Sequence, residues 1–226
     1  MSLERNNDMA RTLSIYLLSL ATLTGHTAES TSTRSAEVSG VFGSAFVNTG
    51  TGEAPVRAGT MLAAGTTIRT ESGAAVDVYL GKEAGVIRLT QNTTVRIEQL
   101  VETNRQSDVY LHLQRGTVLG NGSQASPGSH YQIKTAVGIA EVGSSAFRLH
   151  SEGYLVVLNG AAHFAHVPPN GEPKLHSLNA PPAVYFSPTE GVKPAPKELV
   201  REVVNQSKAR LSQESNQHEP APVRPK

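Results

Sequence analysis

Four carboxylates are the first candidates for acid–base chemistry: Asp77, Glu98, Asp108 and Glu141. Asp77 and Asp108 are the only aspartates after residue 28. A glycosidase needs two carboxyl groups held about 5 to 10 Å apart. Isolated acidic residues at outward strand positions are ordinarily solvated, and the spacing of these four forces no pair to form. A carbohydrate-active enzyme is therefore a disfavoured alternative for this chain.

His163 and His166 form an H-x-x-H motif, which invites a test for a metal site. On a strand, a spacing of three places the two side chains on opposite faces, whereas a shared metal needs helical spacing. His130, His150 and His176 are scattered along the chain, and there is no cysteine to complete a zinc site. We expect these histidines to be surface groups, and we expect no metal site.

Nucleophile and phosphate motifs are also incomplete. The chain has no G-x-S-x-G, and Ser144 follows Gly143 in an expected turn with no helix after it. The glycines at 50–52 and 120–122 lack the lysine and the helix of a phosphate-binding loop. We therefore predict a non-enzymatic protein with no catalytic residue and no cofactor.

Composition excludes further classes. The formal net charge of +1 gives no electrostatic case for nucleic-acid binding. Aromatic residues make up 5% and tryptophan is absent, which removes the stacking platform of a typical single-strand or sugar binder. Without cysteine the chain has no disulfide, no thiolate ligand and no lipoprotein anchor.

The N-terminal region has the order of a secretory signal. Arg5 and Arg11 precede an apolar run at 13–23, which is followed by a polar segment of small residues. The run is too short to span a bilayer as a helix. We predict a signal peptide over residues 1–28 with cleavage after Ala28, and either Met1 or Met9 as the start. The mature protein would be exported, periplasmic or extracellular, with no stable membrane span.

Residues 35–187 have the pattern of an all-β domain. Short alternating runs recur every eight to twelve residues and are separated by Gly, Ser, Asn or Pro. This spacing predicts many short strands in a compact sandwich or a short β-solenoid. The expected strands lie at 36–47, 66–70, 74–80, 86–89, 94–100, 108–116, 131–135, 139–142, 146–150, 153–158, 161–164 and 183–186, with an exposed loop at 120–129.

The C-terminal part changes character after Gly191. Residues 192–213 are expected to form a Pro-rich linker and one amphipathic helix, and residues 214–226 a disordered tail. The apolar stripe of this helix includes Leu199, Val203 and Leu211. We expect the stripe to dock on the parent domain, and self-association through these three residues is the alternative.

Glycine-punctuated motifs follow one another in order over residues 38–164: the segment RAGTMLAAGTTIRT, then Leu113, Gly116 and Val118, then residues 133–149 and 153–164. Together they resemble the FecR domain, an all-β module of bacterial envelope regulators. The first segment resembles the "G, L, G, I, T" pattern of that family, and residues 113–118 resemble its "L, G, V" element. Residues 133–149 resemble the family's core pattern "V-x-T-P, G, A-x-V-x-G-T-x-F". Residues 153–164 resemble the pattern that closes the domain, "G-x-x-x-V, G-x-V". The chain departs from the family pattern at three places. Ala136 replaces the usual proline, Ser144 and Ser145 stand where the family has a threonine, and residues 81–85 lengthen a hairpin loop.

The resemblance implies envelope signalling without catalysis. Membrane-bound relatives carry an anti-sigma segment and a transmembrane helix before this module, and we expect neither here, so only the envelope-side half of such a pathway could operate. The leading hypothesis is a stand-alone exported module that binds a protein or an envelope component through loops and strand edges. A structural, self-associating envelope or matrix protein is the alternative.

Overall fold

The computed structural model describes residues 32–33, 35–81, 84–103, 106–121 and 129–206. The chain divides into two units, residues 1–30 and 31–226, and everything below concerns the second. The predicted signal peptide and tail lie outside the described residues, as does Leu211. Among the described residues, no helix is both long and apolar enough to cross a membrane.

Strands dominate this unit and form two sheets, with one short helix at residues 197–206. In sheet A the order is β4 (Glu53–Pro55), β3 (Ala45–Asn48), β6 (Thr67–Thr70), β9 (Thr94–Glu102), β10 (Ser107–Arg115), β12 (His130–Thr135), β13 (Gly138–Glu141), β15 (Leu155–His166) and β16 (Lys174–Ala180), with β1 (Ser32–Thr33) on the far end of β9. In sheet B it is β5 (Met61–Leu62), β2 (Ala36–Phe42), β7 (Ala75–Gly81), β8 (Gly85–Leu89), β11 (Thr117–Asn121), β14 (Ala146–His150), β15, β17 (Val184–Ser187) and β18 (Gly191–Pro194).

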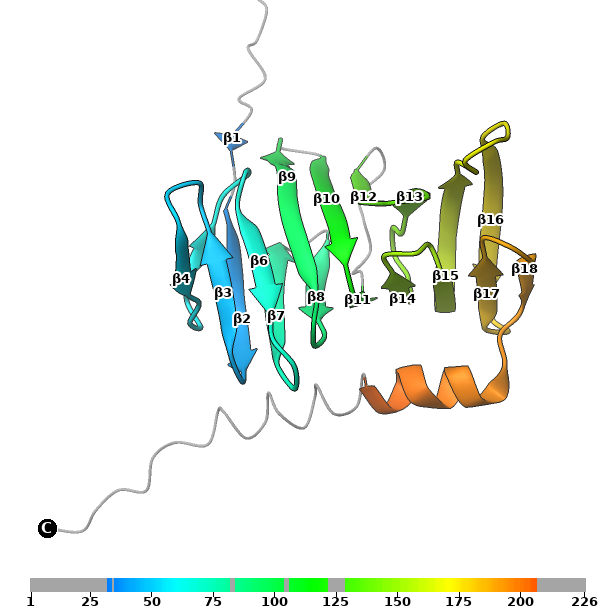
Figure 1. Ribbon diagram of the computed structural model, residues 1–226. Helices are drawn as coiled ribbons and strands as arrows, with labels where there is room; N and C mark the ends of the chain where they lie inside the picture. The colour runs from blue at the N-terminus through cyan, green and yellow to red at the C-terminus, as the bar shows by residue number, and fades with distance from the viewer. Residues whose placement is uncertain (1–31, 34, 82–83, 104–105, 122–128, 207–226) are drawn as a thin grey trace, which may run out of the picture. The chain divides into compact units, whose positions relative to one another are not determined.

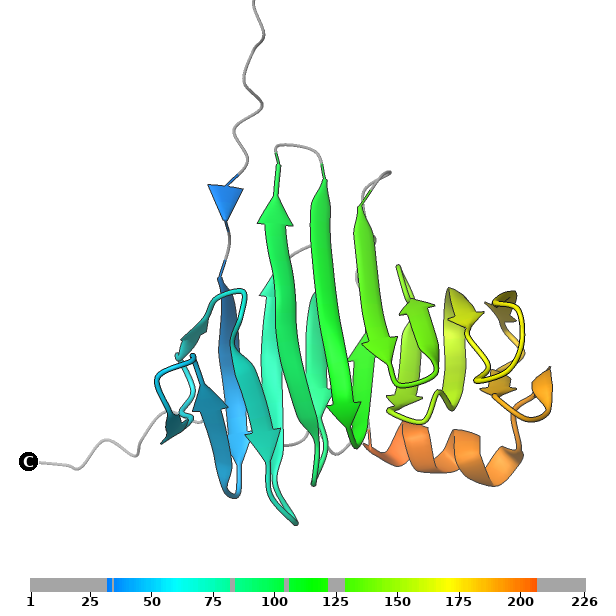
Figure 2. The same cartoon turned by 45° about the horizontal axis from the view of Figure 1, so that its top comes forward.

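Strand order from β2 and β3 onward follows the chain, which alternates between the two sheets (Figure 1). Neighbouring strands are antiparallel except for β10 and β12, which pair in parallel. The long strands β9, β10 and β12 lie side by side in front of sheet B (Figure 2). The fold is therefore all-β, as predicted. It combines the two face-to-face layers of a sandwich with the progressive winding of a solenoid.

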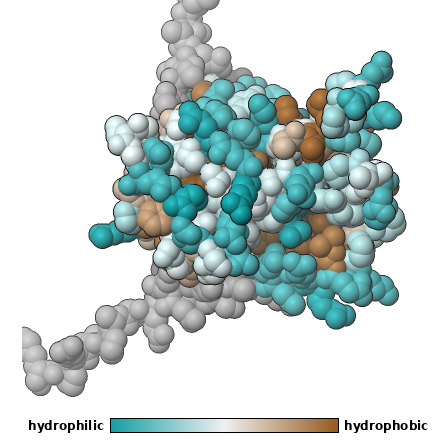
Figure 3. All heavy atoms as spheres, viewed as in Figure 1, coloured by the Kyte–Doolittle hydropathy of each residue, from teal (hydrophilic) through white to brown (hydrophobic). Residues whose placement is uncertain are grey.

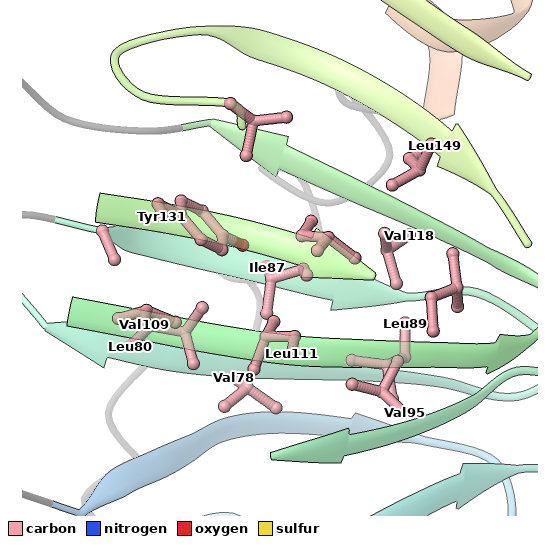
Figure 4. Close-up of a cluster of buried hydrophobic side chains, with 14 of the residues drawn as sticks. Val78, Leu80, Ile87, Leu89, Val95, Val109, Leu111, Val118, Tyr131 and Leu149 are labelled. Atoms are coloured by element: carbon pink, nitrogen blue, oxygen red, sulfur yellow. The ribbon is translucent and has the colours of Figure 1, made fainter. Parts of the chain in front are cut away.

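The core lies between the two sheets because alternate residues of each strand point inward. The burial of β10 alternates residue by residue from Ser107 to Leu113. Inward side chains of sheet A, such as Leu111 and Val95, meet those of sheet B, such as Val78 and Leu89 (Figure 4). This apolar cluster contains residues from nearly every strand and supplies the main driving force for folding.

β15 joins the sheets because its two halves belong to different layers. Residues 155–157 pair with β14 and β17 in sheet B, and residues 160–166 pair with β13 and β16 in sheet A. Gly160 lies at the change of layer with φ +84, and a Cβ there would lie 2.3 Å from the Ser144 carbonyl oxygen. The bend therefore requires glycine. Gly143, which the sequence pattern also places at a turn, has open space around it and no left-handed backbone.

Several boundaries differ from the prediction. The two strands expected at 153–158 and 161–164 form one strand, β15. The expected strand at 36–47 is two strands, because Gly43, with φ +73, turns the chain from sheet B to sheet A. Residues 192–194 are part of β18 rather than a linker, since they pair with β17. β16 was not predicted at all. The loop at 120–129 begins inside β11, and residues 122–128 lie outside the described part of the chain.

Candidate functional site

Three of the four carboxylates singled out from the sequence, Asp77, Glu98 and Glu141, face basic side chains rather than one another. The fourth, Asp108 on β10, has a buried Oδ1 with no hydrogen-bond partner among the described residues. Glu141 lies 3.2 Å from Nδ1 of His130, and Glu98 lies 3.4 Å from Nε of Arg96, all on sheet A. Asp77 is on sheet B and pairs with Arg88. The exposed pairs contribute little to stability. The geometry supplies no carboxylate pair of the glycosidase type from Asp77, Glu98 and Glu141.

The H-x-x-H histidines lie on opposite faces of β15, as its alternation predicts. His163 is exposed and its Nδ1 lies 3.1 Å from Oγ of Ser177, whereas His166 is buried. The expectation that all the histidines are surface groups is wrong for His166, whose ring packs 5.7 Å from that of Phe186. Within the described ranges, no group of three His, Cys, Asp or Glu side chains could hold a metal ion.

Ser144 lies in the turn between β13 and β14, and a strand rather than a helix follows it. The neighbouring Ser145 is buried, and its hydroxyl donates to the carbonyl of Val142. This is the local hydrogen bonding of a turn. The arrangement is not that of a nucleophile elbow.

The outer face of sheet B carries a continuous cross-strand row that we call the outer row. Each member is directly opposite the next on the neighbouring strand, and from Asp77 to Val156 most of their sequence neighbours belong to the core. A sheet aligns side chains in this way because residues in register share a face. From β2 to β18 the outer row consists of Gly40, Asp77, Arg88, Leu119, Arg148, Val156, Tyr185 and Lys193.

Two arginines of the outer row differ in their partners. Arg88 donates from Nε to Asp77 Oδ1 at 2.7 Å and from Nη2 to Oδ2 at 2.6 Å, and this pair is almost fully buried. The Arg88 guanidinium also lies over the Phe42 ring at 5.1 Å. Within the described part of the chain, Arg148 has one ion-pair partner, the carboxylate of Glu202 at 3.9 Å from its Nη2, and its buried Nε has no hydrogen-bond partner.

The C-terminal helix covers the centre of the outer row. Val203 is 1% exposed and packs with Leu119 and Val156, and Leu199 and Tyr185 border this small cluster. The helix runs beside the sheets at the end where β14, β15 and β17 lie (Figure 1). Its apolar stripe docks on its own domain, as predicted. Self-association through Leu199, Val203 and Leu211 stays a prediction.

A polar pocket of about 480 Å³ opens beside the helix. Its walls come from the ends of β8, β10, β14 and the helix, with Arg115, Arg148, Glu202 and Gln206 among the lining residues. The amide oxygen Oε1 of Gln206 is also buried and has no hydrogen-bond partner. Two residues of the pocket wall, Arg148 and Gln206, therefore each have one buried polar atom without a partner among the described residues.

The second candidate site is β16, the last strand of sheet A. It pairs with β15 on one side, and no other described strand pairs with it. Leu175 on its outer face is 71% exposed and continues a cross-strand ladder through Ala165 to Ile139, which is 41% exposed. Hydrophobic spheres appear over this end of the sheet, near β13 and β15 (Figure 3). An open edge lies beside an apolar surface.

The sequence analysis predicted neither the outer row with its pocket nor the open edge of β16. For the outer row, one sequence signal was present. Asp77 interrupts the apolar run from Val76 to Leu80, and a charge in such a run indicates a buried partner. β16 carries no comparable signal, because its residues are mostly polar and exposed.

These features define a two-layer all-β module with a seven-residue open edge at β16 and a polar pocket beside the helix. Residues 66–163 match the model of the family described as FecR protein, which confirms the predicted resemblance. The match runs from β6 into β15 and includes Arg88 and Arg148, while β16 and the helix lie beyond it. No curated protein and no solved structure matches the chain. The FecR domain suggests a regulatory role related to envelope signalling, in a family that is not known for enzymes.

Proposed function

We propose that the chain is a non-catalytic, exported envelope module that binds another protein by adding a strand of that protein to β16. The observation that carries this proposal is the open edge of β16, which is seven residues long. An unpaired edge presents a row of backbone donors and acceptors that an extended segment can satisfy.

The other sheet edges are poorer docking sites. β4 has three residues and ends at Pro55, β5 has two residues, and β18 ends at Pro194. Proline removes a backbone donor, and short strands offer few hydrogen bonds. β16 combines greater length with one exposed apolar side chain on its outer face, so a partner strand could bury its own apolar residues against Leu175.

Self-association of a structural protein is the alternative function. The burial of Val203 against Leu119 and Val156 supports the interaction module instead, because the apolar stripe of the helix is already occupied within the chain. A second copy could still reach β16, and the experiment must separate these cases.

The test places a photo-crosslinking amino acid at Asn179, on the exposed face of β16, in the full chain within its native envelope. A specific covalent adduct to another protein is expected. Leu175→Glu should abolish it, because a charge on an edge strand opposes pairing. Val192→Glu on β18, which is 40% exposed, is the matched control and should leave the adduct unchanged. Adducts equally strong with Leu175→Glu would contradict edge pairing, and a covalent homodimer would favour the structural alternative.

A further inference from the structure

His176 lies near the middle of β16 and points toward the space between the two sheets. It is directly opposite Phe164 on β15, and its ring is half-buried, whereas the outward neighbours Leu175 and Ser177 are exposed. β15 covers one side of β16, and no described strand covers the other. The accessible part of the His176 ring therefore lies toward the open edge.

The His176 ring belongs to a cluster of rings at one end of the core. Its centroid lies 4.7 Å from that of Phe186 on β17 and 6.4 Å from that of His166 on β15. His166 is buried, and its ring lies 5.7 Å from that of Phe186. β16, β17 and β18 lie together at this end of the molecule (Figure 1). Two imidazoles are thus held side by side against an apolar wall.

The third titratable group on this face is also basic. Lys174 is directly opposite His166 in the ladder between β15 and β16, and it shares a face with His176 two residues later. The other strands packed here present uncharged residues on this face: Gly138 on β13, Phe186 on β17 and Val192 on β18.

The acidic side chains of the surrounding elements are directed elsewhere. Glu141 is on the outer face of β13, where its carboxylate lies 3.2 Å from Nδ1 of His130. Glu190 binds Lys193, and Glu172 is exposed in the loop before β16. In the described part of the chain, no carboxylate is therefore placed to stabilise an imidazolium at this end of the core.

Protonation of His176 is unfavourable in this setting. The pKa of His176 is lowered, first by burial and then by the nearby charges of His166 and Lys174. The Phe186 ring can attract a cation, but burial and two basic neighbours act in the opposite direction. A strand added to β16 would cover the accessible part of the imidazole and disfavour its charged form further. Strand binding and protonation of His176 therefore oppose each other.

We propose that His176, together with His166, makes the edge of β16 a pH-gated docking site that binds its partner strand at neutral pH and releases it in mild acid. The inference rests on the proposed function, because it concerns the regulation of the same edge. The partner residue opposite His176 is uncharged, since a carboxylate there would favour the imidazolium and reverse the effect. The affinity is complete above about pH 6.5 and declines as the pH falls, because the unbound edge takes up the proton more readily.

The photo-crosslinking amino acid at Asn179 measures this dependence in the full chain, in envelope preparations held at about pH 7.5 or about pH 5.5 and well below the melting temperature. The adduct yield should fall at least about threefold at the lower pH. His176→Gln removes the titrating group, so its yield should be equal at both pH values. His166→Gln removes one of the two neighbouring charges and should reduce the fall. His112→Gln is the matched control, because β12, β13 and β15 separate it from β16, and it should retain the full fall.

The outcomes separate the two proposals. No adduct at either pH would overturn the proposed function and the gating together. A wild-type yield that is equal at both pH values, or higher in acid, would overturn the gating alone, as would an undiminished fall in both His176→Gln and His166→Gln. Proton NMR of the wild-type chain provides a readout without the partner: His176 should titrate below about pH 6.5, and a pKa at or above that value would also overturn the gating.

Discussion

Asp77 and Arg88 lie directly opposite each other on β7 and β8, and their side chains are joined by two hydrogen bonds while only 1% and 6% exposed. Such a pair loses the hydration of both charges, and its geometry must compensate for that loss. Here the planar fork of Arg88 meets both carboxylate oxygens, and the Phe42 ring covers the guanidinium. The pair fixes the register between two central strands of sheet B.

Breaking this pair on one side should be costly. Asp77→Ala leaves a buried guanidinium without its carboxylate, so we expect the free energy of unfolding to fall by about 3 to 5 kcal/mol. Urea denaturation followed by circular dichroism measures the change. The double variant Asp77→Leu/Arg88→Met removes both charges and should recover most of the loss.

Glu53→Ala provides the matched control for the buried pair. Glu53 binds Arg69 through the same two-bond geometry, at 2.9 and 3.0 Å, but this pair is exposed. Water screens it, and we expect little change in stability. An equal loss in Asp77→Ala and Glu53→Ala would show that burial does not decide the strength of these pairs.

The fold class was predictable because alternation along short strands is a local property. The layer to which each strand belongs was not, because it depends on single backbone turns such as Gly43 and Gly160. The outer row was not predicted for a related reason. Its members are on different strands and become neighbours only through strand register, as for Asp77, Arg88, Leu119 and Arg148. β16 was missed because an edge strand with one buried apolar residue, Leu178, looks like a loop.

Gly160→Ala should destabilise the layer change in β15. The residue has φ +84, and the new Cβ would lie 2.3 Å from the carbonyl oxygen of Ser144, so the backbone must shift. We expect a loss of at least about 2 kcal/mol in the free energy of unfolding. Gly143→Ala, in the adjacent turn, has open space around the new methyl group and should change stability by less than about 0.5 kcal/mol. Equal effects of the two variants in a thermal melt would refute the role of Gly160.

His166 and His176, whose ring centroids lie 6.4 Å apart beside the core residue Phe186, predict a loss of stability in mild acid. The pKa of His176 is lowered, first by burial and then by the nearby charges of His166 and Lys174. Because the unfolded chain binds the proton more tightly, this contribution to stability is complete above about pH 6.5 and declines as the pH falls. The melting temperature should therefore drop between neutral pH and pH 5, and His176→Gln should flatten the profile. His163→Gln, at an exposed site on β15, should leave the slope unchanged; a slope unaffected by His176→Gln would exclude this cause.

Val203→Lys should release the C-terminal helix while the two sheets stay folded. Val203 is 1% exposed between Leu119 and Val156, and this cluster is separate from the core between the sheets. Burying a charged amine there is unfavourable, so the docked state should lose about 2 kcal/mol or more. Hydrogen exchange should show lost protection at residues 197–206 and retained protection in β7 and β8. Arg201→Ala, on the exposed side of the helix, is the control and should retain both. Unfolding of the sheets together with the helix would instead show that the helix is an integral part of the domain.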